Sequence, residues 1–150
     1  MKLKIPPALV LLCFALLMYL LAKFLPVGNF DFFGRRYLIM ALFAMAVIIL
    51  LISFYQFYRA KTTIDPGSPS KASKLLTNGI YKFSRNPIYL AMLLILLAFG
   101  LKLGNAFNSL TAALFVAYMN RFQILPEEEV LSSLFGKEYQ YYCAQVRRWF

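Results

Sequence analysis

Long stretches without a charged residue constrain the fold of this chain more than any other feature. Residues 5–22 are 18 consecutive uncharged residues, and residues 37–58 are another 22. As a helix, the longer stretch measures about 33 Å, enough to cross a bilayer hydrocarbon core of about 30 Å. The sequence therefore predicts at least two membrane-spanning helices in its first 60 residues.

The second half of the chain adds a further apolar region that one charge interrupts. Between residues 87 and 120 the only charged residue is Lys102, and Gly104 and Asn105 follow it closely. Such residues are typical of a tight turn between two helices. We therefore predict an all-α integral membrane helical bundle of four transmembrane helices, the last two forming a tight hairpin, within a single domain of residues 1–150. The predicted spans are residues 5–22, 37–58, 87–101 and 103–125.

Composition excludes several classes of protein. Hydrophobic residues make up 61% of the chain and charged residues 15%, against roughly 45–50% and 25% in soluble domains. The net charge is nevertheless +10. This combination excludes a disordered tail, a secreted disulfide scaffold and a conventional soluble enzyme, and it is typical of a membrane protein with basic loops.

Missing residue types narrow the possible chemistry. The chain has no histidine, which excludes histidine bases and histidine metal ligands. Cys13 and Cys143 form no C-x-x-C pair, and no glycine-rich nucleotide-binding motif occurs. We therefore expect no metal site, and chemistry that uses Arg, Lys, Tyr, Asn and a few carboxylates.

The distribution of positive charge predicts the orientation in the membrane. With four spans and a cytoplasmic N-terminus, 12 of the 16 Lys and Arg residues lie on the cytoplasmic side. We expect a multi-pass protein of the inner or cytoplasmic membrane, with both termini and the central loop in the cytoplasm. The first span has the basic start of a signal peptide, but no small-residue cleavage site follows it, so we expect it to be retained.

The central loop, residues 61–86, is the only long polar stretch, and it ends in Arg85-Asn86-Pro87. Asn is a good N-cap and Pro is favoured at the first helical position, so this tripeptide predicts a helix start at the membrane surface. Such a start beside an Arg suits a carboxylate or a phosphate. Alternatively, the Arg contacts lipid headgroups beside an ordinary cap.

The C-terminal segment, residues 126–150, combines acids, aromatics and arginines. Three of the six acidic residues, Glu127 to Glu129, follow Pro126 directly. Either they complement the dipole of a helix that Pro126 opens, or one of them meets a cation at the cytoplasmic mouth of the bundle. The tyrosines and arginines that follow are typical of an amphipathic helix at the membrane interface. Because aromatic belts are expected in membrane proteins, we do not interpret them as a nucleic-acid patch.

Several of these residues form an ordered set of motifs. The set reads Asn78-Gly79-x-Tyr81, Arg85-x-Pro87-x-Tyr89, Glu127-Glu128-x-x-Leu131, Phe135-Gly136-x-x-Tyr139-x-x-Tyr142 and Val146-x-Arg148. It resembles the isoprenylcysteine carboxyl methyltransferase family, above all its bacterial branch of small integral-membrane methyltransferases, to which phospholipid methyltransferases are related. The resemblance extends from about residue 62 to residue 148.

The resemblance implies a membrane enzyme that binds S-adenosyl-L-methionine, releases S-adenosyl-L-homocysteine, and needs no Rossmann domain. It implies cofactor-binding positions at Leu75, Leu76, Tyr81, Asn86, Pro87, Ile88, Tyr89, Glu127 and Glu128. The E-x-x-L pattern favours Glu128 slightly over Glu127. Arg85, Arg121 and Glu128 are the implied catalytic residues, with the arginines holding the acceptor or the cofactor's carboxylate. The family usually has His where Asn86 stands, and Asn can donate a hydrogen bond but cannot become cationic near neutral pH.

The function expected from the resemblance is methyl transfer to a small or lipophilic acceptor, either a carboxylate such as that of a prenylcysteine or a thiol or amine. The expected partners are membrane lipids and this acceptor, without nucleic acid or metal. The alternative is a non-enzymatic small membrane protein, either a lipid-binding module or a partner subunit. The residues do not decide the oligomeric state or the acceptor.

Overall fold

A computed structural model describes residues 5–28, 30–60 and 74–150 of the chain. The first half of the predicted cofactor loop, residues 61–73, lies outside the described residues. The described part is helical and contains no strand, which confirms the all-α class. Its elements are α1 (Pro7–Phe24), α2 (Arg35–Ala60), the 3₁₀ turn η2 (Gly79–Lys82), α3 (Pro87–Leu103), α4 (Phe107–Met119), the π-helical turn η3 (Asn120–Ile124) and α5 (Leu125–Gln145).

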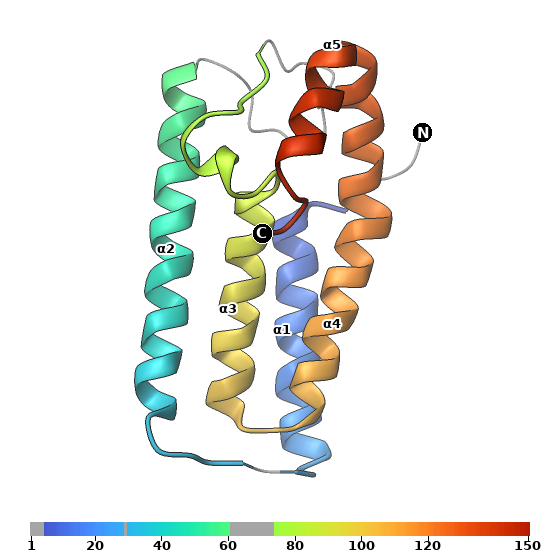
Figure 1. Ribbon diagram of the computed structural model, residues 1–150. Helices are drawn as coiled ribbons and strands as arrows, with labels where there is room; N and C mark the ends of the chain where they lie inside the picture. Colours follow the sequence, from blue (N-terminus) through green and yellow to red (C-terminus); the bar gives the residue numbers. More distant parts are fainter. Residues whose placement is uncertain (1–4, 29, 61–73) are drawn as a thin grey trace.

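Helices α1, α2, α3 and α4 lie side by side, and α3 contacts each of the other three (Figure 1). The central core brings together Met18 of α1, Leu96 of α3, and Phe115 and Met119 of α4, all fully buried. Large apolar side chains such as Leu51 of α2 remain exposed. An apolar exterior around a packed interior is the arrangement expected of a bundle in lipid.

Two helices, α1 and α2, are long and apolar enough to cross a membrane. The 17-residue α3 is apolar but shorter, about 26 Å at 1.5 Å per residue. The predicted count of four crossings therefore stays a prediction for α3 and α4, whereas membrane-crossing length is established for the first two helices.

The turn between α3 and α4 lies slightly later than predicted. We expected it at Lys102, but α3 continues to Leu103 and ends at Gly104, whose φ of 69° is left-handed. Glycine adopts this conformation without steric cost, so it ends the helix more effectively than the charged residue before it. The Arg35 guanidinium donates hydrogen bonds to the carbonyls of Leu101 and Lys102, both at 2.8 Å. Arg35, the first residue of α2, thereby caps α3 at the end of the bundle where α3 and α4 are joined (Figure 1).

The predicted boundary at residue 126 is not a break in the structure. Helix α4 continues through the π turn into α5, so these elements form one continuous helical segment up to the reversal within α5 (Figure 1). Proline lacks an N–H and crowds the preceding turn of a regular α-helix. The π turn ends at Ile124, and Pro126 lies in the first turn of α5, where a missing N–H is tolerated.

The reversal occurs instead at Gly136, whose φ of 51° and ψ of −120° interrupt α5. After it, the chain folds back toward the start of α3 (Figure 1). The predicted interfacial helix is therefore two pieces, one that extends α4 and one that packs back on the bundle.

Candidate active site

An ion-pair network joins the start of α3 to α5 and to the segment after it. Arg148 donates from Nε to Glu128 Oε1 at 3.0 Å and from Nη2 to Oε2 at 2.7 Å. Arg85 Nη2 lies 3.3 Å from Glu128 Oε1. The exposed fractions of the Arg85, Glu128 and Arg148 side chains are 12%, 16% and 32%. One half-buried carboxylate therefore holds two guanidinium groups, and the cluster keeps a net positive charge.

The segment after α5 is fixed by its backbone as well as by its side chains. The Arg85 backbone N–H donates to the Arg147 carbonyl at 3.1 Å, and the Asn86 side-chain amide donates to the Arg148 carbonyl at 3.0 Å. The Trp149 indole donates to Asn120 Oδ1 at 3.0 Å. These bonds place Arg148 over the start of α3.

Asn86 and Pro87 open α3 as predicted, with Asn86 at the N-cap position. The Asn86 side chain makes no capping hydrogen bond, and its Nδ2 donates instead to the Arg148 carbonyl. Asn86 thus acts as a hydrogen-bond donor to the C-terminal segment, a role that needs no cation.

Arg85 also contacts Cys143 of the second half of α5, through Nη1 and Sγ. Its Nε is buried and has no hydrogen-bond partner within the described part of the chain. A buried donor without a partner carries a cost of about 1–3 kcal/mol, and a bound acceptor group would remove that cost. The hydrogen bond to Glu128 raises the pKa of Arg148 above its ordinary value, so this guanidinium stays charged.

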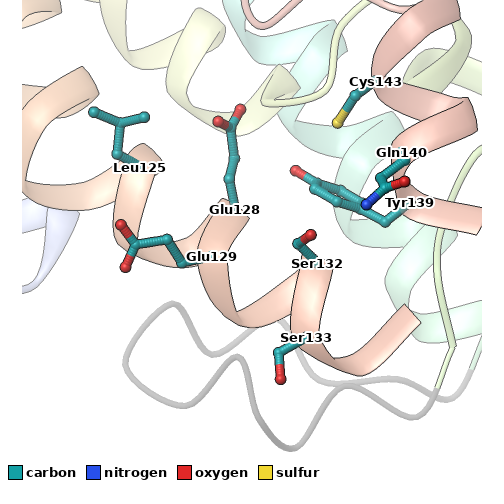
Figure 2. A pocket seen from close by; sticks show the side chains of 8 residues that line it. All are labelled: Leu125, Glu128, Glu129, Ser132, Ser133, Tyr139, Gln140 and Cys143. Carbon is teal, nitrogen blue, oxygen red and sulfur yellow. The ribbon is translucent and has the colours of Figure 1, made fainter. Parts of the chain in front are cut away.

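An open pocket of about 630 Å³ lies beside this network. Its walls come from both halves of α5, which the reversal at Gly136 brings to face one another (Figure 2). The lining residues are Leu125, Glu128, Glu129, Ser132, Ser133, Tyr139, Gln140 and Cys143. The Tyr139 hydroxyl is directed toward the side that Glu128 lines (Figure 2). Burial, followed by the negative charge of Glu128, raises the pKa of Tyr139, so the phenol remains neutral and able to donate.

A second cluster lies deeper, between α3 and the π turn. The Tyr89 hydroxyl and the Gln123 side-chain amide both donate to Oε1 of Glu127, each at 2.7 Å. Tyr89 and Gln123 are buried. Although Glu127 and Glu128 are adjacent in sequence, they serve different clusters, because successive helical residues point about 100° apart.

Tyrosines fix the described end of the predicted cofactor loop. Leu75 and Leu76 pack against a cluster of Tyr81, Tyr139 and Tyr142. The Tyr142 hydroxyl donates to the Tyr81 carbonyl at 2.6 Å. Since Tyr139 also lines the pocket, this cluster forms part of the pocket's support.

The structure brings most of the sequence-predicted site residues together. Arg85 and Glu128 meet directly, Tyr89 meets Glu127, and Pro87 is buried at the start of α3. Ile88 instead packs against the central core. The side chain of Arg121 is exposed on the π turn and is not part of the network with Arg85 and Glu128.

Several residues that the structure places at the site were not predicted from the sequence. Those with side-chain contacts to predicted site residues or to the pocket include Gln123, Tyr139, Cys143 and Arg148. Arg148 and Tyr139 stand within the motifs that carry the family resemblance, and that position was the available signal for both. Gln123 and Cys143 carry no such signal, because their placement depends on the π turn and on the reversal at Gly136.

Comparison with known proteins identifies the family of this chain. The family model described as phospholipid methyltransferase matches residues 35–138, more than half of the chain. An uncharacterized protein of Haemophilus influenzae is 50% identical over 62 residues, which are 41% of this chain and 98% of that relative. No solved structure matches. The chain belongs to the phospholipid methyltransferase family, which includes the isoprenylcysteine carboxyl methyltransferase-like branch, and is thus related to membrane methyltransferases.

Proposed function

We propose that this protein is a membrane methyltransferase that uses S-adenosyl-L-methionine and acts on a small or lipophilic acceptor. The observation that carries the proposal is the pocket beside Arg85, Glu128 and Arg148, within a chain that the phospholipid methyltransferase family matches. We further propose that the pocket faces the cytoplasm, as the positive-inside distribution predicts.

The residues present fit this cofactor. The pocket volume of about 630 Å³ falls within the range of about 300–1,000 Å³ that small-molecule sites occupy. The unpartnered Nε of Arg85 can donate to the cofactor's carboxylate, and the net positive charge of the network favours such an anion. The Tyr139 ring and Leu125 offer aromatic and apolar surface in the pocket wall, and Leu75 and Leu76 pack against the tyrosine cluster that supports it.

Bound S-adenosyl-L-methionine would supply a methyl group on a sulfonium that leaves readily. The chain must therefore align the acceptor and exclude water, and alignment alone can contribute several kcal/mol. Glu128 is poorly placed to act as a general base, because its two oxygens already accept bonds from Arg85 and Arg148. We therefore assign Glu128 to holding the two arginines, and Arg85 to contact with the cofactor or the acceptor.

The absence of an available base at Glu128 favours an acceptor that is nucleophilic without deprotonation by the enzyme. A carboxylate meets this condition at neutral pH, whereas a thiol or an amine is mostly protonated there and must first lose a proton. The apolar exterior of the helices allows a lipophilic acceptor to approach from the bilayer.

Binding of S-adenosyl-L-homocysteine to the purified protein in detergent tests the proposal directly. We expect calorimetric heat and a raised melting temperature, since a ligand that binds only the folded state stabilises it. Arg85→Ala should weaken the affinity about tenfold or more, the usual scale for a charge-assisted hydrogen bond. Lys137→Ala is the matched control, because Lys137 is an exposed cation on α5 outside the pocket.

A second experiment identifies the acceptor. Membranes containing the protein are incubated with methyl-labelled cofactor, and the label is followed into base-labile esters or base-stable products. Absence of both heat and thermal stabilisation, combined with binding to anionic liposomes that needs no cofactor, would instead support the non-enzymatic alternative.

A further inference from the structure

One tyrosine in the pocket wall has a hydroxyl to which the proposed function gives no role. Tyr139 is 5% exposed, yet it lines the pocket, and its hydroxyl is directed toward the side that Glu128 lines (Figure 2). A buried hydroxyl is costly unless it is hydrogen-bonded, and a phenylalanine would fill the same space without that cost. The hydroxyl of Tyr139 therefore calls for a specific role.

The partner that this hydroxyl has in the structure is a weak one. The Tyr139 hydroxyl is hydrogen-bonded to the thiol of Cys143, another lining residue, four positions later on the same helix. Thiol sulfur is a weak hydrogen-bond acceptor. An oxygen atom of a bound ligand would therefore be a better acceptor for Tyr139 than Cys143 is.

A second donor reaches the same sulfur from behind the pocket wall. The Arg85 guanidinium contacts Cys143 Sγ through Nη1, and its buried Nε has no hydrogen-bond partner among the described residues. Tyr139 and Arg85 therefore converge on one weak acceptor. Because Arg85 and Arg148 share the single charge of Glu128, this part of the wall keeps a net positive charge. Two convergent donors in such surroundings favour an anionic oxygen.

The other groups around Tyr139 are compatible with an anion. Burial is the main cause of the raised pKa of Tyr139, which keeps the hydroxyl protonated and able to donate at neutral pH. Glu128, which the hydroxyl faces, is already paired with two arginines. Glu129 also lines the pocket, but its side chain is exposed, so water and salt screen its charge.

We propose that the Tyr139 hydroxyl and the Arg85 guanidinium together form a carboxylate subsite at the pocket wall. This inference rests on the proposed function, which supplies two sources of a carboxylate, the amino-acid end of the cofactor and a lipophilic acceptor. With either source, Tyr139 donates its hydroxyl hydrogen to a carboxylate oxygen in place of its contact with Cys143. The phenol thereby adds a donor to the subsite without adding a further buried cation beside Arg85.

One hydroxyl deletion and two matched pairs of ligands test the inference. Tyr139→Phe keeps the ring in the wall and removes the donor, and Tyr141→Phe is the control, because Tyr141 is exposed on α5 outside the pocket. The first pair is S-adenosyl-L-homocysteine and its decarboxylated analogue. The second pair is dodecanoate, a lipophilic carboxylate, and its uncharged methyl ester. The affinity for each ligand is measured by calorimetry in nonionic micelles, together with the melting temperature of each protein.

We expect Tyr139→Phe to weaken binding of a carboxylate ligand about tenfold and binding of its carboxylate-free counterpart less than about twofold, because only the carboxylate loses a charge-assisted hydrogen bond. Such a difference within the first pair assigns the subsite to the cofactor, and within the second pair to the acceptor. A variant that discriminates within neither pair, whether its affinities fall equally or stay unchanged, overturns the inference.

The outcomes separate this inference from the proposed function. If the unmodified protein does not bind S-adenosyl-L-homocysteine, the proposed function fails, and the dodecanoate pair alone decides on the subsite. If it binds and Tyr139→Phe discriminates within neither pair, only the subsite is refuted. Should Tyr139→Phe lose its cooperative melt, Arg85→Lys decides by the same comparison, since lysine keeps the positive charge but lacks the Nε donor and the planar guanidinium.

Discussion

Replacing Glu128 with Gln should be among the most damaging single changes in the described part of the molecule. The substitution keeps the size of the side chain but removes the charge that Arg85 and Arg148 share. At the 3.3 Å separation from Arg85, the Coulomb attraction is about 5 kcal/mol at an effective dielectric constant of about 20, before desolvation is subtracted. The variant would leave two guanidinium groups facing a neutral amide.

The net loss is smaller than the Coulomb attraction. Breaking a buried ion pair by removing one partner costs about 3–5 kcal/mol. Arg148 is 32% exposed, so water compensates part of its lost partner. We therefore expect Glu128→Gln to lower the free energy of unfolding by about 2–4 kcal/mol and to weaken S-adenosyl-L-homocysteine binding with it.

The assay is equilibrium unfolding in mixed micelles, with a double-mutant cycle. Adding Arg148→Gln to Glu128→Gln removes the excess charge, so the double variant should recover about 1–2 kcal/mol relative to the sum of the single losses. Glu138→Gln, an exposed acid on the same helix, should stay within about 0.5 kcal/mol of the unmodified protein. Single losses that simply add in the double variant would refute the argument that one carboxylate pairs with both arginines.

Two further predictions concern the support of the pocket. Gly136→Ala places a Cβ at φ 51°, ψ −120°, a conformation almost confined to glycine. We therefore expect the free energy of unfolding to fall by about 1–3 kcal/mol, measured by thermal melting, and cofactor binding to weaken, measured by calorimetry. A variant with unchanged affinity would show that the reversal does not shape the pocket. Tyr142→Phe removes the donor to the Tyr81 carbonyl and should cost about 1 kcal/mol at pH 7. Burial raises the pKa of Tyr142 above its usual value of about 10, so this stabilisation is present below pH 10 and is lost as the pH rises further. The difference between the two proteins in unfolding experiments should therefore narrow above pH 10, and a constant difference would contradict this origin.

The parts of the fold that depend on local pattern were predictable from the sequence. Uncharged runs located α1 and α2 because the bilayer imposes a minimum length on apolar helices. The Asn86-Pro87 start of α3 followed from backbone chemistry at a helix N-terminus. The order of the motifs anticipated that Arg85 and Glu128 serve one site, and the structure places them 3.3 Å apart at their nearest polar atoms.

The side chains that the π turn and the reversal at Gly136 bring to the site could not be predicted from the sequence. Arg121 and Arg148 are both arginines near helix ends, and although Arg148 ends the Val146-x-Arg148 motif, the periodicity of the sequence does not show which of the two faces the site. The π turn leaves the side chain of Arg121 exposed, whereas the reversal at Gly136 returns Arg148 to the start of α3. A single inserted residue rotates a helix by about 100°, so which residues face inward depends on a feature that periodicity alone does not reveal.

The same rotation per residue gives the two adjacent glutamates, Glu127 and Glu128, different partners. The E-x-x-L pattern favoured Glu128 as the acid that meets the cofactor, but Glu128 already has two guanidinium partners. A third cation would have to compete with both arginines, and any weakening of their bonds would also loosen Arg148 from the start of α3. Glu127 meets the same helix at Tyr89, four residues after Arg85, through a neutral hydroxyl. Glu128 therefore keeps the architecture of the site intact by pairing with both arginines, and we assign it this role rather than direct contact with a cationic ligand.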